Sequence, residues 1–163
     1  MKRIILVRHA HSSWHNDSLP DIDKPLDDRG YQDAHEMGRY LSRKDFSNKL
    51  VLASPAVRTL TTALIFAREG LFNQSELRIT PALYEATEDK YFESIKGQDD
   101  SFQDLFIFGH NPTISLFHNL LVKRKIVDLS PCQVVIIDCS VSSWSEVEAG
   151  SGKSSVVVDM TQD

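Results

Sequence analysis

Short apolar runs alternate with segments of helical apolar spacing along the first two thirds of the chain. The first run is rich in branched side chains, which is typical of a buried central strand. Residues 11–28 have little periodicity and are predicted to form a long loop, a kind of segment that often carries function. The runs predicted as strands are residues 2–8, 49–54, 77–80 and 104–108.

Apolar positions at helical spacing between these runs predict three helices. The first is capped by Asp27 or Asp28 and runs to about Lys44. The second starts at Pro55 and runs to about Arg68, and the third extends from Pro112 to about Val122. The buried faces are predicted as Tyr31, Ala34, Gly38 and Leu41 in the first helix, Val57, Leu60, Leu64 and Ala67 in the second, and Ile114, Phe117 and Leu121 in the third.

After Cys132 the pattern becomes β-rich. Residues 133–140, 142–148 and 155–160 are predicted as strands, and the turn at 150–152 indicates a hairpin. Strands that alternate with helices and then continue as a β meander predict the α/β class. We expect a three-layer α/β/α sandwich with a mixed, mostly parallel central sheet. No repeat or linker divides the chain, so we expect one domain over residues 1–163.

Charge and composition argue against a nucleic-acid partner and against a membrane partner. The net charge is −5 and no Lys/Arg cluster is present, so a nucleic-acid partner is not expected. No apolar run approaches the roughly 20 residues that span a bilayer, and no signal peptide follows Met1, so we expect a cytoplasmic protein without a membrane partner. Cys132 and Cys139 are interpreted as buried free thiols rather than a disulfide.

Chemistry-bearing residues gather at three predicted strand ends. Arg8 and His9 end the first strand, Arg58 lies one helical turn beyond the second, and His110 follows a later strand. Ligands of open parallel sheets bind outside the carboxyl ends of the strands, so these side chains are expected to converge. Two guanidinium groups can bind a phosphoryl group through charge-assisted hydrogen bonds, and a neutral imidazole can attack phosphorus. The arginines supply the positive charge, so no metal or other cofactor is required.

The reaction also needs a general acid that protonates the leaving atom and then activates water. Glu85 follows the third predicted strand and is the candidate. Glu88 and Asp89 on the same loop are weaker alternatives.

With these residues in this order, the chain resembles the histidine phosphatase superfamily, also called the phosphoglycerate mutase-like family. Within that superfamily it is most similar to the short SixA-type phosphohistidine phosphatases. The likeness covers roughly residues 2–122, and the motifs occur in the family order. These motifs are Arg8-His9-Ala10 for the family's Arg-His-Gly, the approach Pro25-Leu26-Asp27-Asp28-Arg29-Gly30, the Ser54-Pro55-x-x-Arg58-x-x-x-Thr62-Ala63 block, and Gly109-His110-Asn111-Pro112.

The resemblance implies a role for each matched residue. His9 is the nucleophile, Arg8, Arg58 and His110 bind the phosphoryl group, and Glu85 falls where the superfamily places its acid. Further phosphate or substrate contacts are implied for His15, Asn16 and Asn111.

A long lid insertion of the mutase-like members is missing, since only about twenty residues separate Glu85 from the next predicted strand. An open groove is therefore expected. Such a groove suits a phosphohistidine on a protein surface, with a small phosphomonoester as the second choice.

Two other readings stay open. The run His9-x-His11, with His15 and His110, resembles the ligands of a metal-dependent hydrolase, which chelators would inactivate. Against it, the chain has about half the length of a TIM-barrel hydrolase, and two arginines would repel the cation. The other reading is a non-enzymatic phosphate-binding module, which would bind phosphate without turnover.

Overall fold

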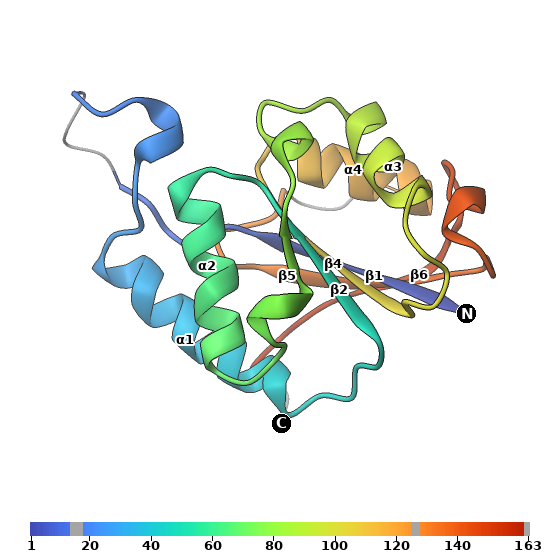
Figure 1. The fold of residues 1–163 in the computed structure, drawn as a ribbon, viewed down its shortest axis with the longest axis horizontal. Helices are drawn as coiled ribbons and strands as arrows, with labels where there is room; N and C mark the ends of the chain where they lie inside the picture. Colours follow the sequence, from blue (N-terminus) through green and yellow to red (C-terminus); the bar gives the residue numbers. More distant parts are fainter. Residues whose placement is uncertain (14–17, 125–127, 162–163) are drawn as a thin grey trace.

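Within residues 1–13, 18–124 and 128–161, which the computed structural model describes, six strands form one sheet (Figure 1). Their order across the sheet is β3-β2-β4-β1-β5-β6. The first four of these run parallel, whereas β5 is antiparallel to both of its neighbours. The strands are β1 (Lys2–Arg8), β2 (Lys49–Ala53), β3 (Leu77–Ile79), β4 (Asp104–Gly109), β5 (Val134–Cys139) and β6 (Gly152–Val157).

Helices cover both faces of this sheet, which confirms the predicted three-layer α/β/α fold. In Figure 1, α1 and α2 lie together on one side and α3 and α4 on the other. Alternate side chains of β1 enter the two cores, with Ile5 and Val7 on the α1 and α2 side and Ile4 and Leu6 on the α3 and α4 side. The helices of the described residues are α1 (Asp28–Ser42), α2 (Val57–Arg68), α3 (Glu88–Lys96) and α4 (Thr113–Val122). None of them is long and apolar enough to cross a bilayer.

The carboxyl ends of the three central parallel strands lie at one edge of the sheet. β1 and β4 are neighbours in register, and the backbone N–H of His9 donates to the carbonyl of Gly109 at 3.2 Å. The N–H of Ser54, after β2, donates to the carbonyl of Phe108 at 3.2 Å. The sheet therefore brings the segments that start at His9, Ser54 and His110 side by side.

The buried face of α2 differs from the prediction. Val57 and Leu64 are each 36% exposed, whereas Thr59 and Thr62 are fully buried. The buried face instead contains Ala63, Ile65 and Phe66 together with these two threonines, whose hydroxyls have hydrogen-bond partners. Thr62, for example, accepts the N–H of Ala10 at 3.0 Å. In α1, Tyr31 is likewise exposed rather than buried.

The chain also departs from the prediction in three segments. Residues 142–148 are not a strand but contain the short 3₁₀ turn Trp144–Glu146, whose buried tryptophan donates from its ring N–H to the Phe102 carbonyl at 3.1 Å. The last strand starts at Gly152 instead of residue 155. Helix α3 was not predicted, because only Tyr91 and Ile95 of its nine residues are buried.

Both cysteines are free and buried, as expected. Cys132 packs in the core on the α1 and α2 side and Cys139 in the opposite core, so the sheet separates them.

Candidate active site

Two imidazole rings lie next to each other at the carboxyl edge of the sheet. The ring centroids of His9 and His110 are 5.4 Å apart, and the ring planes are inclined by 54°. The last residue of β4, just before His110, must be a glycine, because a Cβ on Gly109 would lie 2.1 Å from the Tyr91 hydroxyl oxygen. That hydroxyl in turn lies 3.4 Å from the backbone nitrogen of His110 and accepts its proton.

The His9 ring is held as the tautomer that carries its proton on Nδ1. Nδ1 lies 2.8 Å from the carbonyl oxygen of Ala10, and a carbonyl can only accept, so Nδ1 donates. Nε2 then has a free lone pair, and no hydrogen bond from the described residues reaches it. Burial, with smaller contributions from Arg58 and Arg8, lowers the pKa of His9 to about 4. At neutral pH His9 is thus an uncharged imidazole with a bare Nε2, the form that attacks phosphorus.

The His110 ring presents one unpartnered nitrogen to the site. Its Nε2 lies 2.8 Å from the Ser54 hydroxyl and 3.3 Å from the Thr59 hydroxyl. Its Nδ1 is buried and has no hydrogen-bond partner among the described residues. Burial lowers the pKa of His110 to about 3, with additional contributions from His9 and Arg58. A buried polar atom without a partner marks a place where a ligand atom is expected.

The Arg8 guanidinium has one nitrogen with a hydrogen-bond partner and one without a partner among the described residues. Its Nη1 donates to the Leu129 carbonyl at 2.7 Å, while the buried Nε has no partner within the described part of the chain. Asn111 donates to the same carbonyl at 2.9 Å and accepts from the Ser115 hydroxyl at 2.6 Å. The Asn111 amide therefore fixes the loop that orients Arg8, and the phosphate contact expected for Asn111 stays a prediction. Burial lowers the pKa of Arg8, although a guanidinium stays charged at neutral pH.

Arg58 is held by Asp21, which is held in turn by Tyr84, and the sequence revealed neither residue. Its Nη1 donates to the backbone carbonyl of Asp21 at 2.7 Å, and its Nη2 reaches the Asp21 carboxylate at 3.0 Å. The Tyr84 hydroxyl donates to the same carboxylate at 2.6 Å, and its ring stands edge-on to His110. These hydrogen bonds lower the pKa of Asp21, and the one from Tyr84 raises the pKa of that phenol to about 12. Asp21 is thus an anion that orients the guanidinium.

Glu85 lies at the rim of the site. It is exposed, and its backbone has φ of 50°, a left-handed conformation that a non-glycine residue rarely adopts. Together with Arg58, Tyr84 and His110 it lines a cavity of about 270 Å³. The structure thus places the candidate acid on the same cavity as Arg58 and His110, and its catalytic role remains a prediction.

Of the other histidine candidates, only His11 falls within the described residues. Its Nδ1 is paired with the carboxylate of Asp27, which also caps α1 by accepting the Gly30 N–H at 2.8 Å. His15 and Asn16 lie outside the described residues, so the contacts expected of them stay predictions. The described residues contain no group of three or more His, Cys, Asp or Glu side chains that could hold a metal ion.

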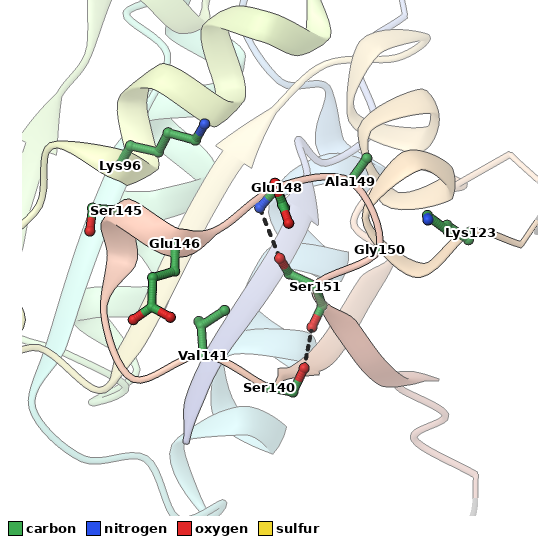
Figure 2. A pocket seen from close by; sticks show the side chains of 10 residues that line it. All are labelled: Lys96, Lys123, Ser140, Val141, Ser145, Glu146, Glu148, Ala149, Gly150 and Ser151. Atoms are coloured by element: carbon green, nitrogen blue, oxygen red, sulfur yellow. Dashed lines mark hydrogen bonds between the residues drawn. The ribbon is translucent and has the colours of Figure 1, made fainter.

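A larger cavity, about 610 Å³, lies at the opposite edge of the sheet, past the end of β5 (Figure 2). Its loop is closed by hydrogen bonds of Ser151, which accepts the N–H of Glu148 and, at its carbonyl, the N–H of Ser140. Figure 2 shows the two lysines of its lining, Lys96 at the end of α3 and Lys123 just after the end of α4. It contains neither imidazole nor arginine, whereas the lining of the smaller cavity includes His110 and Arg58.

A family model of the histidine phosphatase superfamily (branch 1) matches residues 4–106, well over half of the chain. The chain belongs to the histidine phosphatase superfamily. It is accordingly a phosphatase. The matched residues include Arg8, His9 and Arg58, whereas His110 lies beyond them and is placed at the site by the structure.

The chain is also similar to several known proteins. An uncharacterized chloroplastic protein of Arabidopsis thaliana is 30% identical over 159 residues, which cover 93% of this chain and 72% of that protein. The structure of the protein histidine phosphatase SixA complexed with tungstate has a TM-score of 0.75 at 16% identity, covering 93% of this chain and 92% of that one. A mycobacterial glucosyl-3-phosphoglycerate phosphatase has a TM-score of 0.67 at 11% identity, covering 90% and 95%. At these identities the two structures show that this histidine phosphatase shares their fold.

Proposed function

We propose that this histidine phosphatase works without a metal, through a phosphohistidine on His9, and that its substrate is a protein phosphohistidine. One observation carries the proposal. Three atoms without hydrogen-bond partners among the described residues belong to side chains of one sheet edge, namely the bare Nε2 of His9, Nε of Arg8 and Nδ1 of His110. A nucleophile beside two donors is the arrangement that binds and attacks a phosphoryl group.

In the first step, the Nε2 lone pair of His9 attacks phosphorus in line, and the bond from phosphorus to the leaving nitrogen or oxygen breaks. The leaving atom takes a proton from the general acid. The phosphorylated ring keeps its Nδ1 proton on the Ala10 carbonyl and is cationic, which makes it a good leaving group. Water then attacks phosphorus, gives its proton to the conjugate base of that acid, and returns the electron pair to Nε2.

The neutral state of His9 gives a pH prediction. Protonation blocks Nε2, and burial lowers the pKa of His9 to about 4, so the reactive form persists below the usual histidine range. For an aryl phosphate, whose leaving oxygen needs little help from a general acid, we expect the rate of phosphoenzyme formation, corrected for substrate ionisation, to stay level from about pH 8 to about pH 5 and to fall as pH approaches 4. A stopped-flow or quenched single-turnover series checks this. An acidic limb centred near pH 6.5 would contradict the proposed state of His9.

Glu85 is proposed as the general acid because it lines the cavity that contains His110 and Arg58. We expect Glu85→Gln to lower kcat/KM about 10²-fold for an alkyl phosphate, whose leaving oxygen needs a proton, and much less for an aryl phosphate. The matched control is Glu88→Gln, at the start of α3, which should leave kcat/KM unchanged for both substrates. An unchanged pH–rate profile in Glu85→Gln would remove Glu85 from the mechanism.

The protein-substrate part of the proposal is supported by the size of the site. The cavity of about 270 Å³ is slightly below the lower end of the range for sites that enclose a small molecule, roughly 300–1,000 Å³. It can take a phosphoryl group and its first neighbours, while the remainder of the substrate stays outside. The segment between Glu85 and β4 holds only the short helix α3.

A substrate panel tests this choice. A phosphohistidine protein, free phosphohistidine and several small phosphomonoesters are compared by kcat/KM, with inorganic tungstate as a competitor for the phosphoryl subsite. We expect the phosphohistidine protein to be preferred. Preference for one small ester would favour a small-molecule phosphatase of the same superfamily. Tungstate binding without turnover of any substrate would favour a non-enzymatic phosphate-binding module.

A further inference from the structure

Buried hydroxyl groups meet the His110 ring on the side away from its unpartnered nitrogen. Ser54 and Thr59 are both fully buried, one just before α2 and the other in its first turn. Their oxygens lie 2.8 and 3.3 Å from Nε2 of His110. These hydroxyls lie on the face of α2 that apolar spacing alone did not predict to be buried.

A count of hydrogens at Ser54 fixes the direction of the shorter bond. The Ser54 oxygen already accepts the backbone N–H of Ala56 at 3.3 Å. Its own hydrogen needs an acceptor, and the acceptor within reach among the described residues is Nε2 of His110. If Nε2 carried a proton instead, the Ser54 hydroxyl hydrogen would be buried without an acceptor among the described residues, which is costly.

We propose that Ser54 and Thr59 are positioning residues that hold His110 as the tautomer with its proton on Nδ1. The Ser54 hydroxyl donates to the bare Nε2, with Thr59 beside it, so the single ring proton is on the buried Nδ1, which has no partner among the described residues. A neutral His110 can then donate to a phosphoryl oxygen, whereas the opposite tautomer would face that oxygen with a lone pair. This reading of Nδ1 rests on the proposed function, but the tautomer itself is a property of the resting protein.

The direct test is nitrogen NMR of the resting enzyme labelled with ¹⁵N-histidine, with the His110 signals assigned from their loss in His110→Asn. A bare ring nitrogen resonates far downfield of a protonated one, so the two tautomers give opposite patterns. We expect wild-type His110 to show a protonated Nδ1 and a bare Nε2 above about pH 5, since burial keeps the ring neutral there. A protonated Nε2 in the wild type would overturn the proposal. No substrate is used, so this result does not depend on the identity of the substrate.

Variants then test the two hydroxyls. We expect Ser54→Ala combined with Thr59→Val to move the His110 proton partly to Nε2 and to lower kcat/KM about 10- to 100-fold, as when a hydrogen-bond partner of a functional histidine is removed. Thr59→Val alone keeps the shape of the side chain and leaves the Ala56 N–H paired, so it should fold normally and give a smaller change. Thr59→Ser, which retains the hydroxyl, should restore the wild-type pattern.

The matched control is Thr61→Val, in the same helix, because Thr61 makes no hydrogen bond to His110 in the described structure. It should change neither the tautomer nor kcat/KM. A folded double variant that keeps the Nδ1–H pattern and full activity would overturn the proposal, even if phosphoenzyme formation on His9 is established.

Discussion

Replacing His9 with alanine is expected to lower phosphatase turnover by about 10⁴- to 10⁶-fold, the loss seen when an enzyme loses its covalent nucleophile. The reason is geometric. Ala10 holds the His9 proton on Nδ1, which leaves Nε2 bare beside Arg8 and His110. The variant should still fold, because the hydrogen bond of the His9 side chain within the described residues is to its neighbour Ala10. Steady-state turnover of a phosphohistidine protein and an aryl phosphate measures the effect.

The matched control for His9→Ala is His11→Ala. His11 is close in sequence, but its Nδ1 is paired with Asp27 at the start of α1. We therefore expect a modest loss of thermal stability and retained turnover. If His9→Ala keeps full activity while a chelator abolishes it, the metal-dependent reading is correct instead.

Removal of the Arg58 side chain should have the second largest effect. Arg58 is held by Asp21 at the cavity that contains His110, and its side chain is only 12% exposed. We expect Arg58→Ala to lower kcat/KM about 10²- to 10³-fold, the cost of removing one preorganised donor to a developing anion. Arg58→Lys should recover only part of this, because an ammonium lacks the planar fork of the guanidinium.

Arg68→Ala is the control for this substitution. Arg68 lies in the last turn of the same helix and is exposed, so its removal changes the net charge equally without touching the cavity. We expect wild-type turnover from this variant. Equal losses in Arg58→Ala and Arg68→Ala would show that net charge, rather than the site, explains the effect.

The fold could be predicted because the apolar pattern is strong where strands are buried on both faces. β1 and β4 are apolar runs of this kind, and their neighbouring positions place His9 beside His110. Order along the chain was sufficient here, since parallel strands put their carboxyl ends at the same edge. The convergence of Arg8 and His9 with His110 could thus be expected before the structure.

Contacts made by short polar side chains and by the backbone could not be predicted. Asp21 holds Arg58 from a loop with little periodicity, and Tyr84 donates to the Asp21 carboxylate from another segment. The buried face of α2 contains Ala63 and Phe66 together with two threonines whose hydroxyls find partners, and the predicted apolar spacing did not select this face.

The central claim is that phosphate passes through His9. Rapid quench into alkaline denaturant, with substrate labelled in its phosphoryl group, tests it directly, because a phosphohistidine is labile to acid and stable to base. The quench should recover labelled protein from the wild type and from His11→Ala, and none from His9→Ala. Label that persists in His9→Ala, or turnover by the wild type without labelled protein at any time, would contradict the account.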